Sequence, residues 1–250
     1  MKRTTGMIIT SALMLSFCFT ALAQTGNGLT KDQIVAGKVA DKLTSQDRFH
    51  GISVEADDRI VLLTGKVDLY IDKVDAAKKA EKADGVSGVR NEIVVEGKRV
   101  SDAELQETLA SKLRYDRVGY GIVFNNLAVT VTDGKAVVSG NVRDYPDRDS
   151  AIAIVETTPG VRDVVDEISV APVSAFDDQL RIRLARAIYG HSSLQRYAMD
   201  PQAPIRIVVE SGRADLYGMV STEMDKQIAF MQANSVAGVF GVTNHLVVAP

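Results

Sequence analysis

One short sequence pattern ends three segments of this 250-residue chain. It reads DGVSGVRNEIVV at 84–95, TPGVRDVVDEISV at 158–170 and VAGVFGVTNHLVV at 236–248. A second glycine stands 20 residues before the glycine of each pattern: Gly65 before Gly85, Gly140 before Gly160, and Gly218 before Gly238. Equal spacing in three places without an insertion indicates a structural unit that is repeated three times. We assign all six glycines to the fold.

Each copy begins with signals for an amphipathic helix. Thr30 to Gln33 and Ser101 to Glu104 fit the capping box, in which a hydroxyl accepts from a free amide of the first turn. Ser174 begins a looser version in the third copy. Apolar residues then recur every four positions, which predicts a helix with one buried face. They are Val35, Val39, Leu43; Leu105, Leu109, Leu113; and Leu180, Leu184, Ile188.

Two strands, a second helix and a third strand follow in every copy. The first two strands flank short turns at 57–59, 133–135 and 211–213, two of which contain glycine, as in a hairpin. The glycine of the second strand suits a close approach of another backbone. We therefore predict an α+β fold of three tandem small domains. Each is helix-strand-strand-helix-strand, with two helices on one face of a three-stranded mixed sheet.

The expected domains are residues 30–98, 99–172 and 173–250. Before them, residues 1–23 have a charged start, a short apolar run and the small residues Ala21 and Ala23, which predicts a secretory signal peptide cleaved after Ala23. An uncleaved membrane anchor is the alternative. A lipoprotein signal is disfavoured because Phe17 precedes Cys18. We therefore expect a periplasmic protein.

Composition excludes several classes of function. Cys18 is the only cysteine, so the expected mature chain has no disulfide and no thiolate metal site. The acidic net charge argues against a nucleic-acid binder. The three histidines occupy unmatched positions, and no phosphate loop or nucleophile elbow occurs. We predict no enzyme, no cofactor, no metal and no small-molecule substrate.

The element order, the strand-end Gly-x-Val and the closing Gly-Val-x-x-Val-x-[Asn/Asp]-x-[Ile/Leu] together resemble the BON domain family, in three tandem copies. The resemblance implies a cell-envelope module without catalytic residues, which binds phospholipid surfaces or envelope proteins and is linked to osmotic or envelope stress. The third copy departs from the pattern. It has an insertion, and Glu223 stands where the other copies have Tyr70 and Tyr145.

Binding residues are expected mainly between the first helix and first strand, where the copies differ most in length. Basic and tyrosine side chains there suit an anionic lipid interface, and the third copy's first helix resembles a basic amphipathic helix. The alternative is that the tyrosines pack between domains and the arginines are solvated. The candidates are Arg114, Tyr115, Arg117, Tyr120, Arg181, Arg183, Arg186, Tyr189, Arg196 and Tyr197.

Two functions follow from these features. The first is a non-enzymatic module that associates with phospholipid membrane surfaces and supports envelope integrity or osmotic-stress tolerance. Residues 173–250 are the least acidic part, with seven basic and seven acidic residues, so electrostatics favours them as the lipid-facing copy. The second is a chaperone-like or scaffold protein that binds envelope proteins through sheet edges or grooves between domains.

Overall fold

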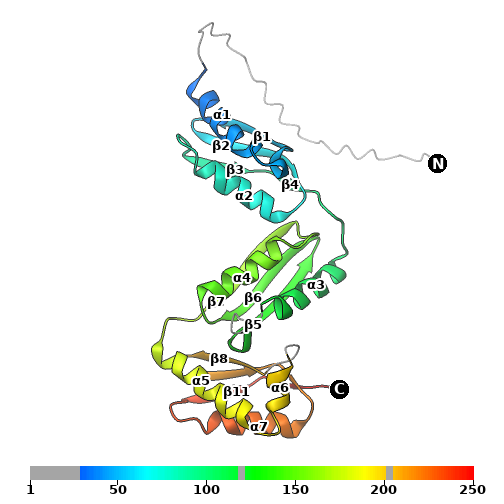
Figure 1. Ribbon diagram of the computed structural model, residues 1–250, viewed down its shortest axis with the longest axis vertical. Coiled ribbons are helices and arrows are strands. Elements are labelled where there is room, and N and C mark those ends of the chain that lie inside the picture. The colour runs from blue at the N-terminus through cyan, green and yellow to red at the C-terminus, as the bar shows by residue number, and fades with distance from the viewer. Residues whose placement is uncertain (1–28, 118–121, 201–204) are drawn as a thin grey trace, which may run out of the picture.

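The computed structural model describes residues 29–117, 122–200 and 205–250, which form three small domains in a row along the long axis (Figure 1). The predicted signal peptide and Tyr120 lie outside the described residues. We name the domains by their elements. Domain 1 contains α1 (Lys31–Thr44), η1 (Asp47–Phe49), β1 (Ile52–Asp57), β2 (Ile60–Val67), α2 (Tyr70–Glu81), β3 (Gly88–Asn91) and β4 (Val94–Val95).

The other two domains repeat this order with small additions. Domain 2 contains α3 (Asp102–Tyr115), η2 (Ile122–Phe124), β5 (Asn126–Thr132), β6 (Lys135–Val142), α4 (Tyr145–Glu156) and β7 (Asp163–Val170). Domain 3 contains α5 (Ala175–Gly190), α6 (Gln195–Met199), β8 (Arg206–Glu210), β9 (Arg213–Tyr217), β10 (Met219–Val220), α7 (Glu223–Asn234), β11 (Gly241–Asn244) and β12 (Val247–Val248).

The predicted mixed sheets are confirmed. The second strand is central in each, with the first strand antiparallel on one side and the last strand parallel on the other. Both helices pack against one face of the sheet and form a separate core with it in each domain. All nine apolar residues predicted at four-residue spacing in the first helices are buried. The sequence repeat is therefore a repeat of independent cores.

The closing glycines of the repeat lie in the turn between the second helix and the last strand, and not within a strand. The φ angles are +94° at Gly85, +100° at Gly160 and +93° at Gly238, a region that residues with a side chain rarely adopt. A Cβ at Gly85 would lie 3.0 Å from the side chain of Val35, and a Cβ at Gly160 would lie 2.9 Å from that of Val100. These glycines therefore let the turn pass close to the start of the first helix, which fits the structural role expected of them.

In all three domains, the hairpin turn bonds to an aspartate at the start of the first helix. Both turn residues have positive φ at Asp58/Arg59 in domain 1, and likewise at Asp133/Gly134 in domain 2 and Ser211/Gly212 in domain 3, as in the tight turns that match strand twist. In domains 2 and 3 their amides donate to the carboxylates of Asp102 and Asp177 at 2.7–3.0 Å. In domain 1, Arg59 donates to Asp32 in the same way. Each aspartate stands three residues before the first buried apolar residue of its helix, so the same contact ties helix to hairpin three times.

The closing pattern of the repeat also has a local structural role. The side chains of Asn91, Asp166 and Asn244 each accept a hydrogen bond from the amide two residues later, at 2.9–3.2 Å. Neighbouring residues of this strand bond inward to the second strand, so these amides point away from the sheet. The asparagine or aspartate of the pattern therefore satisfies a backbone donor on the outer edge of the last strand.

The domains meet at two different junctions. Tyr70, at the start of α2, packs against the cores of both domains 1 and 2. Burial raises the pKa of its hydroxyl, and the carboxylates of Asp163 and Glu156 raise it further. At the second junction, Val123 and Phe124 of η2 pack against the core of domain 3, with η2 beside β8. Tyr145, which corresponds to Tyr70, is 65% exposed, so the first junction is not repeated at the second.

Candidate functional site

Three of the candidate lipid contacts are buried and do not lie at a surface. Arg117 is 1% exposed, Arg181 3% and Tyr197 6%. The guanidinium of Arg181 donates to Asp178 and to the carbonyl oxygen of Val209, both at 2.7 Å. These side chains are covered by their own domains and bond within them, so they are not available to a headgroup.

The remaining candidates differ in their placement. Tyr189 is largely covered, its hydroxyl donates to Ile205, and burial raises its pKa. Tyr115 is half-buried, whereas Arg114, Arg183, Arg186 and Arg196 are exposed. Arg114 lies near the second junction, because its charge and that of Arg117 add to the effect of burial in lowering the pKa of Arg206 on β8. Of the candidate arginines on α5, only Arg183 and Arg186 therefore lie on its outer surface.

Arg117 and Arg196 belong to an arginine–aspartate pair that recurs in all three domains. Seven residues after the glycine of the second strand comes a buried aspartate, at Asp72, Asp147 and Asp225. An arginine from the segment after the first helix pairs with each one, and the pairs are Arg48–Asp72, Arg117–Asp147 and Arg196–Asp225. The equal spacing of the aspartates is visible in the sequence, but their partners are not.

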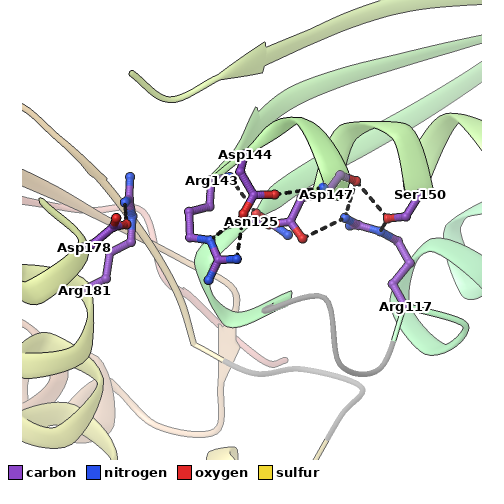
Figure 2. Close-up of polar contacts among 8 residues, drawn as sticks. All are labelled: Arg117, Asn125, Arg143, Asp144, Asp147, Ser150, Asp178 and Arg181. Carbon is purple, nitrogen blue, oxygen red and sulfur yellow. Dashed lines mark hydrogen bonds and ion pairs between the residues drawn. The ribbon is translucent and has the colours of Figure 1, made fainter. Parts of the chain in front are cut away.

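The pair of domain 2 is the most deeply buried and is drawn in Figure 2. Arg117 donates to the carbonyl oxygen of Asp147 at 2.6 Å and to Ser150 at 3.0 Å, and it lies 4.0 Å from the Asp147 carboxylate. Burial raises the pKa of the Asp147 carboxyl, although Asn125 and nearby arginines favour its charged form. This pair is a structural element of the domain core.

The pair of domain 3 gives a testable pH dependence. Burial alone would raise the pKa of Asp225, but hydrogen bonds from Thr222 and Tyr197, with the charge of Arg196, hold it below the usual 3.8. A carboxyl whose pKa is lower in the folded state stabilises the fold above its unfolded pKa, and this stability is lost as pH falls through the folded pKa. We expect Asp225→Asn to lower the free energy of unfolding by about 1 kcal/mol at neutral pH.

The difference between Asp225→Asn and the unchanged protein should shrink when the pH is lowered below the usual carboxyl pKa of 3.8. Urea unfolding followed by far-UV circular dichroism at neutral and acidic pH measures it. A difference that is the same at both pH values would contradict the assignment of a stabilising ionised carboxylate.

Exposed apolar side chains gather on domain 3. Of the fifteen large apolar side chains that are exposed among the described residues, ten lie in residues 173–250. Phe176 on α5 and Phe240 before β11 stack with ring centroids 5.9 Å apart, and Phe240 is 72% exposed. Met224 and Met231, which are two helical turns apart on one face of α7, are more than half exposed. Helices α5 and α7 lie beside each other in Figure 1.

A basic side chain borders the aromatic pair of this surface. A side chain built at Gly238 would lie 3.4 Å from both Phe176 and the guanidinium of Arg183, so Arg183 lies beside the aromatic pair. Within residues 29–117, 122–200 and 205–250, neither Arg183 nor Arg186 has an acidic partner within 4.0 Å. We call Phe176, Arg183, Arg186, Phe240 and the two methionines of α7 the domain 3 face.

The domain 3 face is specific to the third copy. Phe240 stands two residues after the closing glycine, where domains 1 and 2 have Ser87 and Arg162. Phe176 corresponds to Lys31 and Ser101, counting back from the aspartate that caps the hairpin. The sequence pattern indicated the arginines of α5 but neither phenylalanine, because the two rings come together only in the folded domain.

A cavity of about 310 Å³ lies at the second junction, lined by residues of both domains. Arg143 bonds to Asp144 at 2.6 Å, Arg181 bonds to Asp178 at 2.7 Å, and the two pairs lie on either side of the junction (Figure 2). Since each arginine is matched by a carboxylate, the cavity has no excess of charge that would select an anion or a cation.

Within the described ranges, no helix is both long and apolar enough to cross a bilayer. The same ranges contain no group of three or more histidine, cysteine, aspartate or glutamate side chains placed to hold a metal ion.

Comparisons with known proteins agree with the repeat. The family model of the BON domain matches residues 31–97, 101–172 and 191–250. The third match begins after α5, where the third copy departs from the other two. "Osmotically-inducible protein Y" of Escherichia coli (strain K12) is 25% identical over 146 residues, which cover 55% of this chain and 71% of that protein.

Two solved structures are similar at a low level. The C-terminal domain of CdsD, a structural protein of the type III secretion system of Chlamydia trachomatis, has 13% identity and a TM-score of 0.26, and the alignment covers 86% of this chain and 96% of that one. The PrgH periplasmic domain has 10% identity and a TM-score of 0.19, with 84% and 100% covered. Such TM-scores support no argument about arrangement or function.

Proposed function

Because the chain belongs to the BON domain family, we propose that it is an exported, non-enzymatic protein of the cell envelope that acts under osmotic stress, as the name of its Escherichia coli relative suggests. We further propose that it associates with anionic phospholipid surfaces through the domain 3 face. The observation that carries this proposal is the stacked Phe176–Phe240 pair, exposed beside Arg183.

Apolar and basic groups act at different depths of a bilayer. Aromatic rings and methionine side chains gain free energy by leaving water, at about 1.5–3 kcal/mol for a fully buried phenylalanine. Arginines close to them reach the phosphates, each contributing about 1 kcal/mol at an anionic surface. Domain 3 combines both kinds of group on its helical side. Domain 2 has only Tyr145 among the exposed large apolar side chains of the described residues, and it carries more acidic than basic residues.

Co-sedimentation of residues 24–250 with vesicles of phosphatidylglycerol and phosphatidylcholine, compared with phosphatidylcholine alone, tests the proposal. We expect binding to the anionic vesicles that weakens with salt, because salt screens exposed charges. Phe176→Ser with Phe240→Ser should weaken binding about tenfold or more at every salt concentration. Arg183→Glu with Arg186→Glu should weaken it mainly at low salt.

Lys98→Glu with Arg99→Glu is the matched control. This double change alters the net charge by the same amount, but it lies in the exposed connection between domains 1 and 2. Equal losses for the two charge-reversal variants would indicate attraction by net charge alone and would contradict a specific face. The absence of binding to vesicles of either composition would refute the lipid proposal.

Binding to a protein partner would support the chaperone-like or scaffold alternative, and its salt dependence would distinguish it from binding to lipid. Association that depends on apolar contacts persists at high salt, whereas binding to lipid phosphates through exposed arginines weakens. The exposed methionines of α7 also suit this alternative, because methionine adapts to irregular apolar partners.

A further inference from the structure

The first helix of domain 3 closes the outer edge of its first strand. Next to the hairpin turn, Glu210 pairs with Arg213, so the backbone groups of Val209 point away from β9. Arg181 on α5 donates to the carbonyl oxygen of Val209 at 2.7 Å. Tyr189, two turns further along the same side of α5, donates to the carbonyl oxygen of Ile205 just before β8. Two side chains therefore occupy backbone carbonyl oxygens to which an added strand would have to bond.

Domain 2 closes the same edge with one side chain. Gln106 of α3 accepts a hydrogen bond from the amide of Val131 at 3.0 Å. Gln106 follows the first buried apolar residue of its helix, as Arg181 does in domain 3, and Val131 is the counterpart of Val209 next to the turn. The two domains therefore use one helical position to occupy one place on the strand edge.

Domain 1 has no such side chain. Ala36 stands at the position of Gln106 and Arg181, and its methyl group cannot form a hydrogen bond. Thr44 stands at the position of Tyr189, but its hydroxyl donates to Ala40 within α1 at 2.9 Å. Across the described ranges, no side chain bonds to the backbone of β1 at the residues whose amides and carbonyls point away from β2, which are Ile52, Val54 and Ala56.

At the other edge of each sheet, the asparagine or aspartate of the closing pattern accepts from one outward-facing amide. Among the outer edges of the three first strands β1, β5 and β8, that of β1 thus differs by having no side-chain cap. An unpaired edge offers a row of donors and acceptors to a further strand, and proteins usually block such rows. The open edge of β1 is a place where an extended peptide can add to the sheet.

The surroundings of β1 indicate which peptide would fit. A depression of about 390 Å³ lies across the helix-free face of the sheet, lined by Glu55 and Asp57 of β1, Ile60 and Leu62 of β2 and Arg90 of β3. Alternate side chains of an added strand would lie on that face, next to the carboxylates of β1. The remaining side chains would point toward the α1 side, where the half-buried Ala36 and Ala40 present methyl groups that small apolar side chains would suit.

We propose that the outer edge of β1 binds an extended segment of a partner protein by strand addition, with basic side chains on one face of the segment and small apolar side chains on the other. This site is in domain 1 and does not depend on lipid binding by domain 3.

The probe is a fluorescein-labelled peptide Lys-Val-Lys-Val-Lys-Val-Lys, and its binding to residues 24–250 is measured by fluorescence anisotropy. Ala36→Gln introduces the cap of domain 2 into domain 1, and we expect it to weaken binding about tenfold or more. Lys38→Gln, which is exposed on the same helix, should leave binding unchanged. Hydrogen exchange should show protection of Ile52, Val54 and Ala56 when the peptide is bound.

Two further peptides test whether backbone pairing is required. One has N-methylated valines and the other N-methylated lysines, so each lacks the donors of one strand edge while keeping all charges. We expect one of them to lose binding. Equal binding of all three peptides would mean attraction by charge alone and would overturn the proposal, as would unchanged binding to Ala36→Gln.

Two other results have a defined meaning. A dimer of the free protein that Ala36→Gln converts to a monomer would assign the edge to a second copy of the chain and would also overturn the proposal. Arg183→Glu with Arg186→Glu should leave peptide binding unchanged. Failure of the lipid proposal is therefore distinguishable from failure of this one.

Discussion

Replacing Gly140 by alanine should lower the stability of domain 2 by more than about 3 kcal/mol, because the new methyl group has no room and the backbone has no suitable conformation. Gly140 has a φ of +117°, and a Cβ at this position would lie 2.1 Å from the carbonyl oxygen of Asn126. That oxygen belongs to the paired strand and cannot rotate away as a side chain can. Relief requires separating β5 from β6 near the end of the hairpin.

Hydrogen exchange measured by mass spectrometry resolves the domains and is the appropriate measurement, since the chain has no tryptophan. The amides of β5 and β6 should lose protection in Gly140→Ala, while those of domain 1 keep it. Gly37→Ala is the matched control, because Gly37 lies inside α1 and a Cβ there would meet nothing within 4 Å. It should stabilise domain 1 by about 1 kcal/mol. Equal effects of the two changes would show that the position of Gly140 has no special requirement.

The arrangement within each domain could be predicted because its determinants are local and repeated three times. The four-residue spacing of Val35, Val39 and Leu43 defines one face of a helix wherever that helix packs. The strand glycine is recognisable because its place in the repeat does not change. Its place is fixed because a Cβ at Gly65 would lie 2.0 Å from the carbonyl oxygen of Gly51. Local signals of this kind do not depend on knowing which partner they meet.

The burial of charged residues could not be predicted in the same way. Arg181, Arg183 and Arg186 look alike in the sequence of α5, but one is 3% exposed and the other two lie on the surface. The difference comes from the Val209 carbonyl, which is 28 residues away in the sequence and accepts from Arg181. An arginine on the border of an apolar stripe can extend toward solvent or toward a strand edge, and only the tertiary structure decides between them.

The candidate binding surface was predictable as a domain but not as a set of residues. The balanced charge of residues 173–250 indicated the third copy. The aromatic pair was missed because Phe176 and Phe240 are far apart in the sequence and stack only when α5 and the turn before β11 meet. Comparing the copies position by position was the more informative signal, since Phe240 replaces Ser87 and Arg162.

Replacing Arg117 by alanine should destabilise domain 2 by about 3–5 kcal/mol, because it leaves the carboxylate of Asp147 buried without its partner. Both side chains are 2% exposed, so water cannot replace the lost charge. The guanidinium bonds to Asp147 and Ser150 would be lost as well. Urea unfolding with hydrogen exchange measures the loss. Arg48→Ala is the matched control, since it removes the same pair in domain 1 where the arginine is 39% exposed, and it should cost about 1 kcal/mol or less.

The double variant Arg117→Met with Asp147→Ala distinguishes the cost of an unpaired buried charge from the cost of lost packing. Removing both charges leaves no unpaired ion in the core, so the double variant should be more stable than Arg117→Ala by about 2 kcal/mol or more. Vesicle binding by the double variant should equal that of the unchanged protein, because Arg117 does not reach the surface. Weaker vesicle binding by a fully folded double variant would mean that Arg117 contacts lipid. It would contradict the core role that the burial of Arg117 indicates.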